Sequence, residues 1–287
     1  MNKKTMKQGL WDYRKLVLKN FLKKKLVVLG FLITVIMTLI AVFAPWIATA
    51  DPYATDVMAK LSAPSATHFF GTDQLGRDIF SRVIYGTRIS MEVGLSTAFA
   101  ALVIGLLLGL AAGYVKMLDN VIMRVCEALG AIPPILMAIA LVSALGASTG
   151  NVILALSIVY IPTIARVTRA STLSVKEMTY IEAIQSQGAG WSKILFCHIA
   201  PNVLSPVIVQ TTYIFASAII TEAALSFLGA GVPAPAPSLG NILYEAKSYI
   251  YNATWMTVFP GLFTVLIVLG LNLFGDGLRD IVDPMSN

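Results

Sequence analysis

Residues 91–115 read MEVGLSTAFAALVIGLLLGLAAGYV, and this stretch sets the class of fold. It contains one charged side chain, Glu92, among residues that are otherwise apolar, small or uncharged. An α-helix of about 20 apolar residues crosses the hydrocarbon core of a bilayer. The stretch therefore predicts a helix that spans a membrane.

The spacing of small residues inside this stretch predicts how the helix packs. Ala101, Gly105, Gly109 and Gly113 recur every four residues, so they share one face of the helix. Small residues at this spacing let two helix backbones approach closely in lipid, where the hydrophobic effect drives no association. We expect this face to pack on another helix. Lining of a pore is the alternative interpretation.

The rest of the chain has the same character. Apolar residues make up 57% of the 287 residues and charged residues only 13%, which exceeds what one soluble core can bury. The first apolar run could be a cleaved signal, because Ala48-Thr49-Ala50 has the small-x-small form, but the run is longer than the roughly 7–15 residues of a signal core. We predict an all-α, multi-pass membrane protein with six transmembrane helices: Leu26–Ala48, Met91–Val115, Val121–Leu145, Val152–Val167, Val203–Phe227 and Met256–Phe274.

Lysine and arginine set the predicted orientation, because cytoplasmic flanks retain these residues. Residues 1–25 hold nine of them, and placing this end inside puts sixteen on the inner side against five outside. Both termini are then cytoplasmic. The basic character is explained by orientation in the membrane, and we expect no nucleic-acid partner.

One inner segment is longer than a turn requires. Residues 180–202 read YIEAIQSQGAGWSKILFCHIAPN and follow the fourth span. The pattern predicts a helix to Gln187, a break at Gly188, which can adopt left-handed backbone angles cheaply, and a second short helix from Trp191. Pro201 is expected to stop that second helix, because proline lacks the backbone donor.

The second short helix predicts an exposed ridge. Trp191, Ile194, Leu195 and His198 follow the i, i+3, i+4, i+7 spacing that lines one helix face. Such a ridge fits a groove in a partner protein. A linker that packs on its own transmembrane bundle is the alternative.

The same segment resembles the EAA signature of ABC importer permeases, which runs Glu-Ala-Ala, three residues, Gly, nine residues, Ile, any residue, Leu-Pro. Glu182-Ala183, Gly188 and Pro201 keep that spacing, whereas Ile184, His198 and Ala200 depart from it. Further motifs are similar to those of the second permease subunit of the dipeptide/oligopeptide (peptide/nickel/glutathione) importers: GTDQLGRD at 71–78, ALSFLG at 224–229, GDGLRD at 275–280 and Asp283-Pro284.

This resemblance implies a type I ABC importer permease in a bacterial inner membrane, with lipid around it. A second permease chain would complete the pathway for short peptides, two ATP-binding subunits would hold ATP and magnesium, and an extracytoplasmic substrate-binding protein would deliver the solute. The coupling residues implied by the motif and its ridge are Glu182, Ala183, Gly188, Trp191, Ile194, Leu195, His198 and Pro201.

This chain would then be a transport subunit, not an enzyme, and would carry no cofactor. It contains no Gly-Lys pair and hence no phosphate-binding loop. The resulting division is a cytoplasmic basic segment 1–25, a first transmembrane helix 26–48, an extracytoplasmic segment 49–90, and a permease core 91–285 with the cytoplasmic coupling loop 168–202.

Three acidic residues lie at or inside predicted spans, where a charge is costly. Glu92 can pair with Arg88 four residues earlier, and Glu127 with Arg124 three residues earlier. Glu222 has no such partner and is the candidate for lining the transport pathway.

Pro133-Pro134 and Pro162 interrupt helical hydrogen bonding inside the third and fourth spans. They are interpreted either as hinges for alternating access or as static kinks.

Other function classes have less support. A secondary, ion-coupled transporter favours inverted sequence repeats, and none is seen. An intramembrane enzyme needs a reactive constellation, and His68 and His198 are the only histidines, too few for a metal site. A permease for a nickel chelate, glutathione or another small solute remains an alternative, because relatives of the same shape carry them.

Overall fold

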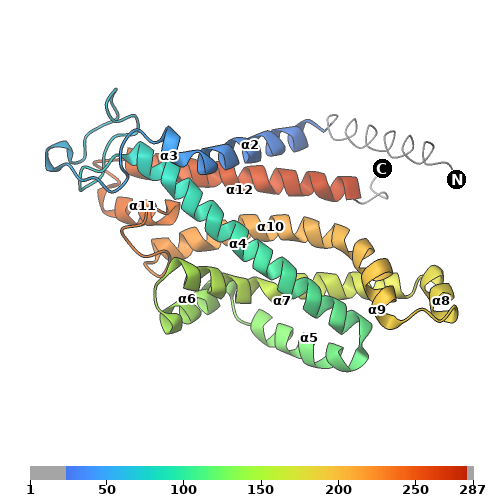
Figure 1. Cartoon of the computed structure of the whole chain (residues 1–287). Helices are drawn as coiled ribbons and strands as arrows, with labels where there is room; N and C mark the ends of the chain where they lie inside the picture. Colours follow the sequence, from blue (N-terminus) through green and yellow to red (C-terminus); the bar gives the residue numbers. More distant parts are fainter. Residues whose placement is uncertain (1–23, 283–287) are drawn as a thin grey trace.

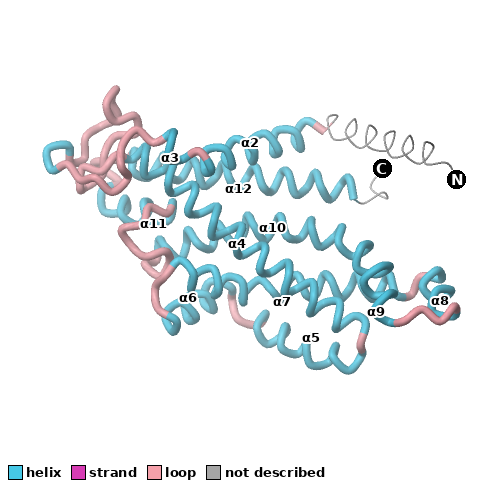
Figure 2. Tube along the Cα trace, viewed as in Figure 1, coloured by secondary structure: helices cyan, strands magenta, loops and turns pink. Residues whose placement is uncertain are grey.

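The computed structural model describes residues 24–282, and the regular structure in that range is helical apart from one isolated bridge between Thr72 and Asp78. Figure 2 shows helices joined by loops throughout. The predicted all-α class is confirmed. The basic segment 1–25 that orients the chain lies outside the described residues except for Lys24 and Lys25.

Five helices are long and apolar enough to cross a membrane. They correspond to the first, second, fourth, fifth and sixth predicted spans. The short helix α3 (Ala44–Ile47) extends the first of them. The five are α2 (Lys25–Val42), α4 (Ile79–Tyr114), α7 (Thr149–Lys176), α10 (Ala200–Phe227) and α12 (Trp255–Val282).

The third predicted span, Val121–Leu145, is not one straight helix. It divides into α5 (Lys116–Gly130) and α6 (Pro134–Leu145), and the two are bent by 93°. Pro133 precedes α6 and Pro134 lies in its first turn. Because proline donates no backbone hydrogen bond, an α-helix cannot continue unbroken through this pair. Counted as one broken span, α5 and α6 bring the number to six.

Helix α4 is the long diagonal of the bundle (Figure 1). Its 36 residues measure about 54 Å at about 1.5 Å per residue, which exceeds the roughly 30 Å hydrocarbon core. It begins at Ile79, so residues 79–90 of the segment predicted as extracytoplasmic form its first turns. Such a helix must tilt or extend beyond the hydrocarbon, and Figure 1 shows it crossing α10 and α7 obliquely.

The small-residue stripe of α4 lies against α7. A Cβ atom on Gly105 would stand 2.6 Å from the Cβ of Ile164, and one on Gly113 would stand 2.6 Å from the Cβ of Thr172. Gly109 faces Thr168 in the same way, and Ala101 is fully buried. Each step of four residues on α4 meets a step of four on α7. This is the close backbone approach that the four-residue spacing predicts.

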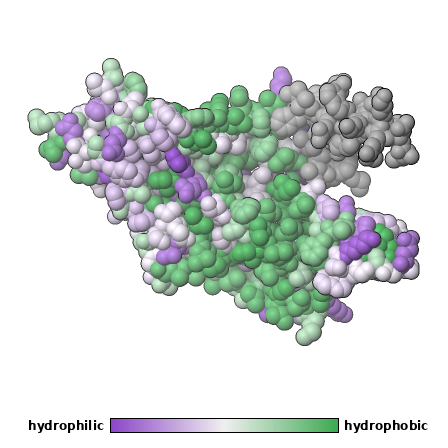
Figure 3. All heavy atoms as spheres, viewed as in Figure 1, coloured by the Kyte–Doolittle hydropathy of each residue, from purple (hydrophilic) through white to green (hydrophobic). Residues whose placement is uncertain are grey.

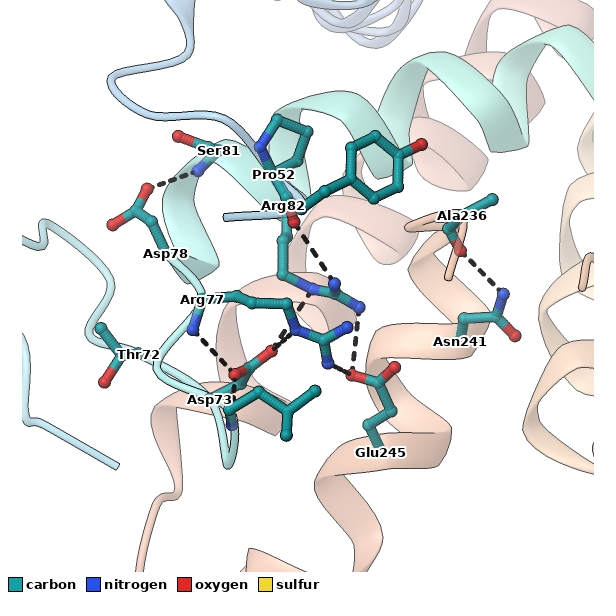
Figure 4. Close-up of polar contacts among 12 residues, drawn as sticks. Pro52, Thr72, Asp73, Arg77, Asp78, Ser81, Arg82, Ala236, Asn241 and Glu245 are labelled. Atoms are coloured by element: carbon teal, nitrogen blue, oxygen red, sulfur yellow. Dashed lines mark hydrogen bonds and ion pairs between the residues drawn. The ribbon is translucent and has the colours of Figure 1, made fainter. Parts of the chain in front are cut away.

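A buried ion cluster ties the segment before α4 to the short helix α11 (Leu239–Ala246). Arg77 contacts Asp73 and Glu245 at 2.5 Å each, and Arg82 lies 3.0 Å from Glu245 and 3.6 Å from Asp73. Figure 4 shows the two guanidinium groups between the two carboxylates. The side chains of Asp73 and Arg82 are fully buried, and that of Glu245 is 17% exposed. Two positive charges are therefore balanced by two negative charges away from water.

Asp78 has a different role from Asp73. Its carboxylate accepts a hydrogen bond from the backbone N–H of Ser81 at 2.8 Å, so it caps the N-terminus of α4. Its other oxygen lies 3.0 Å from Nδ1 of His68. Of the two aspartates in the GTDQLGRD motif, only Asp73 pairs with Arg77, whose other carboxylate partner is Glu245 of α11. The motif therefore lies where the loop, α4 and α11 meet.

Candidate functional site

The segment between α7 and α10 lies at the end of the bundle opposite to α11 (Figure 1). It contains α8 (Thr179–Ser186), α9 (Trp191–Ile194) and a π-helical turn η2 (Leu195–Ile199). Lys24 and Asp280, which form an ion pair at 2.6 Å, mark the corresponding ends of α2 and α12. The segment therefore stands where the predicted topology puts the cytoplasm.

Helix α8 ends at the glycine that the sequence singled out. Gly188 has φ +80°, its N–H donates to the carbonyl of Gln185, and the N–H of Ala189 donates to the carbonyl of Ile184. This pair of hydrogen bonds is the Schellman arrangement, which needs the left-handed conformation that glycine adopts without strain. The chain reverses here and presents α9 beside α8.

The predicted exposed ridge is wrong for two of its members. Ile194 and Leu195 are 2% and 7% exposed, and they pack with Ile181, Ile199 and Leu110 in one core cluster. Their side chains hold the segment to the bundle, so they cannot enter a partner's groove in this conformation. Of the residues that the spacing groups together, Trp191 is exposed, whereas Ile194 and Leu195 point into the bundle.

Pro201 does not stop the helix. The chain continues from α9 through η2 into α10, and Pro201 lies in the first turn of α10. The π-turn accommodates the missing donor, and its last N–H, on Ala200, bonds the carbonyl of Leu195. Asn202 Nδ2 donates to the carbonyl of His198 at 2.7 Å, and Tyr180 Oη donates to the same oxygen at 3.4 Å.

The coupling face, as we define it, consists of five of the exposed side chains of this segment: Tyr180, Glu182, Ala183, Trp191 and Phe196. Trp191 is 64% exposed and Phe196 is 56% exposed, which is unusual for such large apolar groups outside a membrane. Figure 3 shows hydrophilic and hydrophobic areas side by side at this end of the molecule. Exposed aromatic residues suit a protein partner. Sequence reasoning missed Tyr180 and Phe196, because neither stands in the signature.

Glu222 lies inside the bundle rather than at an open surface. Its exposed fraction is 0%, and its two oxygens accept hydrogen bonds of 2.8 Å from Ser90 on α4 and Ser226 on α10. Ser226 follows Glu222 by four residues, so the carboxyl has a hydrogen-bond donor nearby in sequence, although it has no basic partner there. The geometry assigns the carboxyl to a network that joins α4, α10 and the start of α11, where Ser90 also accepts from the N–H of Leu239. Its pathway role stays a prediction.

The two other predicted acidic pairs differ from each other. Arg124 and Glu127 form an ion pair at 3.4 Å, as expected. No ion pair joins Arg88 to Glu92 in the structure of residues 24–282, and both side chains are exposed on α4. Within the same range, no three metal-ligating side chains stand together.

Two family models match the chain. Residues 73–286 match the binding-protein-dependent transport system inner membrane component, and residues 12–64 match the N-terminal transmembrane domain of oligopeptide transport permease C. The chain is 43% identical to the dipeptide transport system permease protein DppC of Alkalihalophilus pseudofirmus, over 93% of this chain and 88% of that one.

It is 42% identical to the glutathione transport system permease protein GsiD of Pectobacterium atrosepticum, over 93% of this chain and 89% of that one. Among solved structures, the inward-facing MetNI methionine ABC transporter matches with a TM-score of 0.59 and 22% identity, over 71% of this chain and 97% of that chain. The last likeness concerns the fold alone.

Proposed function

Because the chain belongs to the binding-protein-dependent transport system inner membrane components, with the N-terminal domain of the oligopeptide permease C type, we propose that it forms one half of an inward pathway for short peptides. It is a permease of an ABC importer, an inner membrane component with multiple spans and no catalytic role. Membership of this family implies ATPase and binding-protein partners. The other half of the pathway is a second permease chain, and two ATP-binding subunits supply the energy.

The observation that carries the proposal is the coupling face on its rigid base. Trp191 and Phe196 are exposed, while Ile194, Leu195 and Ile199 in the same turns are buried in the bundle. A push on the exposed side chains is therefore transmitted to α10 through a continuous helix and a packed core. ATP-binding subunits that close on nucleotide would move α10 in this way.

Short peptides are the substrate class that the relatives support. The relatives at 41–45% identity include permeases named for dipeptide, di/tripeptide, D,D-dipeptide and glutathione transport. All of these solutes are peptides or peptide-like molecules. Glutathione is the second candidate, because one relative of equal similarity carries that name. Uptake of labelled dipeptides, tripeptides and glutathione by proteoliposomes with the cognate binding protein separates the two.

A double variant tests the coupling role. We expect Glu182→Ala combined with Trp191→Ala to leave membrane insertion unchanged, because both side chains are exposed and support no core contact. ATP hydrolysis stimulated by loaded binding protein should then no longer drive uptake. Met178→Ala is the matched control, since Met178 is exposed in the same segment but belongs to neither the signature nor the coupling face.

Purification of the importer under mild detergent provides the first check on the partners. The proposal expects a separate polypeptide with a phosphate-binding loop to co-purify with the chain. A lone chain that transports peptides in proteoliposomes would overturn the ATP-driven assembly. Normal coupling in the double variant would overturn only the role of the coupling face.

A further inference from the structure

A hollow of about 500 Å³ lies between α2, α4 and α10. It includes Val42, the last residue of α2, which lies just before α3 at the end of the bundle away from the coupling face (Figure 1). Ala41 of α2, Met91 and Leu95 of α4, and Phe215 of α10 form apolar walls. Arg88 and Glu92 are the two charged residues at the hollow. Along α4, Arg88 stands nearest the outer end and Leu95 deepest. The hollow is therefore apolar in depth and charged toward its rim.

The depth of this rim matches the headgroup level of the outer leaflet. Val42, which also lines the hollow, is 17 residues from Lys25 at the other end of α2, or about 26 Å at about 1.5 Å per residue. That rise nearly spans the roughly 30 Å hydrocarbon core. Trp46, four residues further on, is 76% exposed. Tryptophan is enriched where the hydrocarbon meets the headgroups, so it marks the same boundary.

Arg88 and Glu92 are not neutralised by the described part of the chain. They stand one turn apart on α4, both are exposed, and neither forms an ion pair in residues 24–282. A positive and a negative side chain at the edge of an apolar hollow are stabilised most by a ligand that offers each of them a group of opposite charge. A group with a phosphate and an ammonium about one helical turn apart fits both.

The surface around the hollow has the character of a lipid-facing surface. Large apolar side chains are exposed next to the lining residues, as at Leu39 of α2 and Phe99 of α4. Interfaces between membrane helices are enriched in small residues instead, and the small residues of α4 face α7 inside the bundle. Figure 3 shows mainly hydrophobic surface over the middle of the molecule, with a small hydrophilic area near the start of α4.

We propose that this hollow binds one phospholipid of the outer leaflet whose headgroup carries both a phosphate and an ammonium group, such as phosphatidylethanolamine. Arg88 donates hydrogen bonds to the phosphate, Glu92 accepts them from the ammonium, and an acyl chain lies along Ala41, Leu95 and Phe215. A purely anionic headgroup fits less well, because it leaves Glu92 beside a like charge. The assignment to the outer leaflet rests on the predicted orientation, with both termini cytoplasmic, and on the proposed function.

The test uses the complete importer in nanodiscs of phosphatidylglycerol that contain a trace of photoactivatable phosphatidylethanolamine. After illumination, we expect the label on residues 38–42 and 91–95, and unlabelled phosphatidylethanolamine should compete for it. Arg88→Gln and Glu92→Gln should each reduce labelling about threefold to fivefold, as expected for a partly exposed charge pair. Arg88→Lys should retain most of it. Arg124→Gln, at an exposed charge on α5, is the matched control.

Three results would overturn the proposal. Labelling that spreads evenly over α2 and α4 and ignores both variants means ordinary surrounding lipid. Cross-links from residues 88–95 to the second permease chain mean a subunit interface. Variants that change the KM for peptide uptake at unchanged labelling mean a peptide site. Elution of each variant complex at the wild-type volume in gel filtration excludes misfolding. Labelling of the wild type does not depend on the transported solute. The lipid proposal can therefore fail while the proposed function holds.

Discussion

Replacing Glu245 by glutamine tests whether the buried ion cluster fastens the segment before α4 to the rest of the bundle. The variant keeps the size of the side chain but leaves Arg77 and Arg82 with Asp73 as their only carboxylate. Removal of one partner from a buried ion pair costs about 3–5 kcal/mol. Because Glu245 is 17% exposed and water screens it in part, we take the lower end, about 3 kcal/mol.

The expected shift in thermal unfolding follows from this free energy. For a chain of this length, 1 kcal/mol moves the midpoint by about 2–4 °C. Glu245→Gln should therefore lower the midpoint by about 6–12 °C. Trp255 offers a local probe, because its Nε1 donates to the carbonyl of Thr72 at 3.1 Å beside the cluster. Tryptophan emission of the purified complex, followed with temperature, gives the measurement.

A second substitution distinguishes charge balance from simple loss of contacts. Arg77→Met added to Glu245→Gln leaves one positive and one negative charge, on Arg82 and Asp73. We expect the double variant to recover at least half of the lost midpoint, because the two substitutions share one network and are not additive. Lys60→Gln, at an exposed residue of the same segment, should change the free energy of unfolding by no more than about 0.5 kcal/mol. The reasoning is refuted if Glu245→Gln unfolds like the wild type, or if the double variant is less stable than the single one.

Gly109→Val should destabilise the α4–α7 contact by about 1–3 kcal/mol, because Thr168 occupies the space of the new Cβ. Gly261→Ala is the control: no atom lies within 4 Å of its new Cβ, so it should be nearly neutral in the same melting assay. Ser90→Ala should lower stability by about 1–3 kcal/mol by leaving Glu222 short of a donor. If Ser90→Ala instead alters which peptides compete for uptake, the structural role of Glu222 is contradicted. Gly188→Val should disturb the end of α8 more than Gly188→Asn, because asparagine tolerates φ near +80°. Hydrogen exchange of residues 179–199 would show the difference, and equal protection in the two variants would count against it.

Much of the fold was predictable from local properties of the sequence. Long apolar runs must form helices in a membrane, because no water is present there to satisfy backbone groups. The spacing of Gly105, Gly109 and Gly113 indicated a helix-packing face because the period of the helix puts them in line. Gly188 was predictable as a break because only a residue without Cβ takes its backbone angles without strain.

What a side chain faces was decided by tertiary structure. The spacing of Trp191, Ile194 and Leu195 is the same whether the face meets a partner or the chain's own bundle, and only the packing of Ile181 and Leu110 shows that the latter two are buried. Glu222 and Glu92 are both acidic residues at or inside predicted spans, and in the sequence only Glu92 has a basic residue, Arg88, one helical turn away. In the structure Glu222 is buried with two serine donors, and the other two are exposed without a partner in the described residues.

The sequence by itself determined the class of protein, the positions of its spans and the segment that matches the coupling signature, because these depend on composition and on periods of a few residues. The tertiary structure alone decided that Glu245 joins Arg77 across 168 positions of chain and that the third span is bent by 93°. Contacts between residues so far apart in the sequence depend on how whole helices cross, and a local pattern of residues does not predict that crossing.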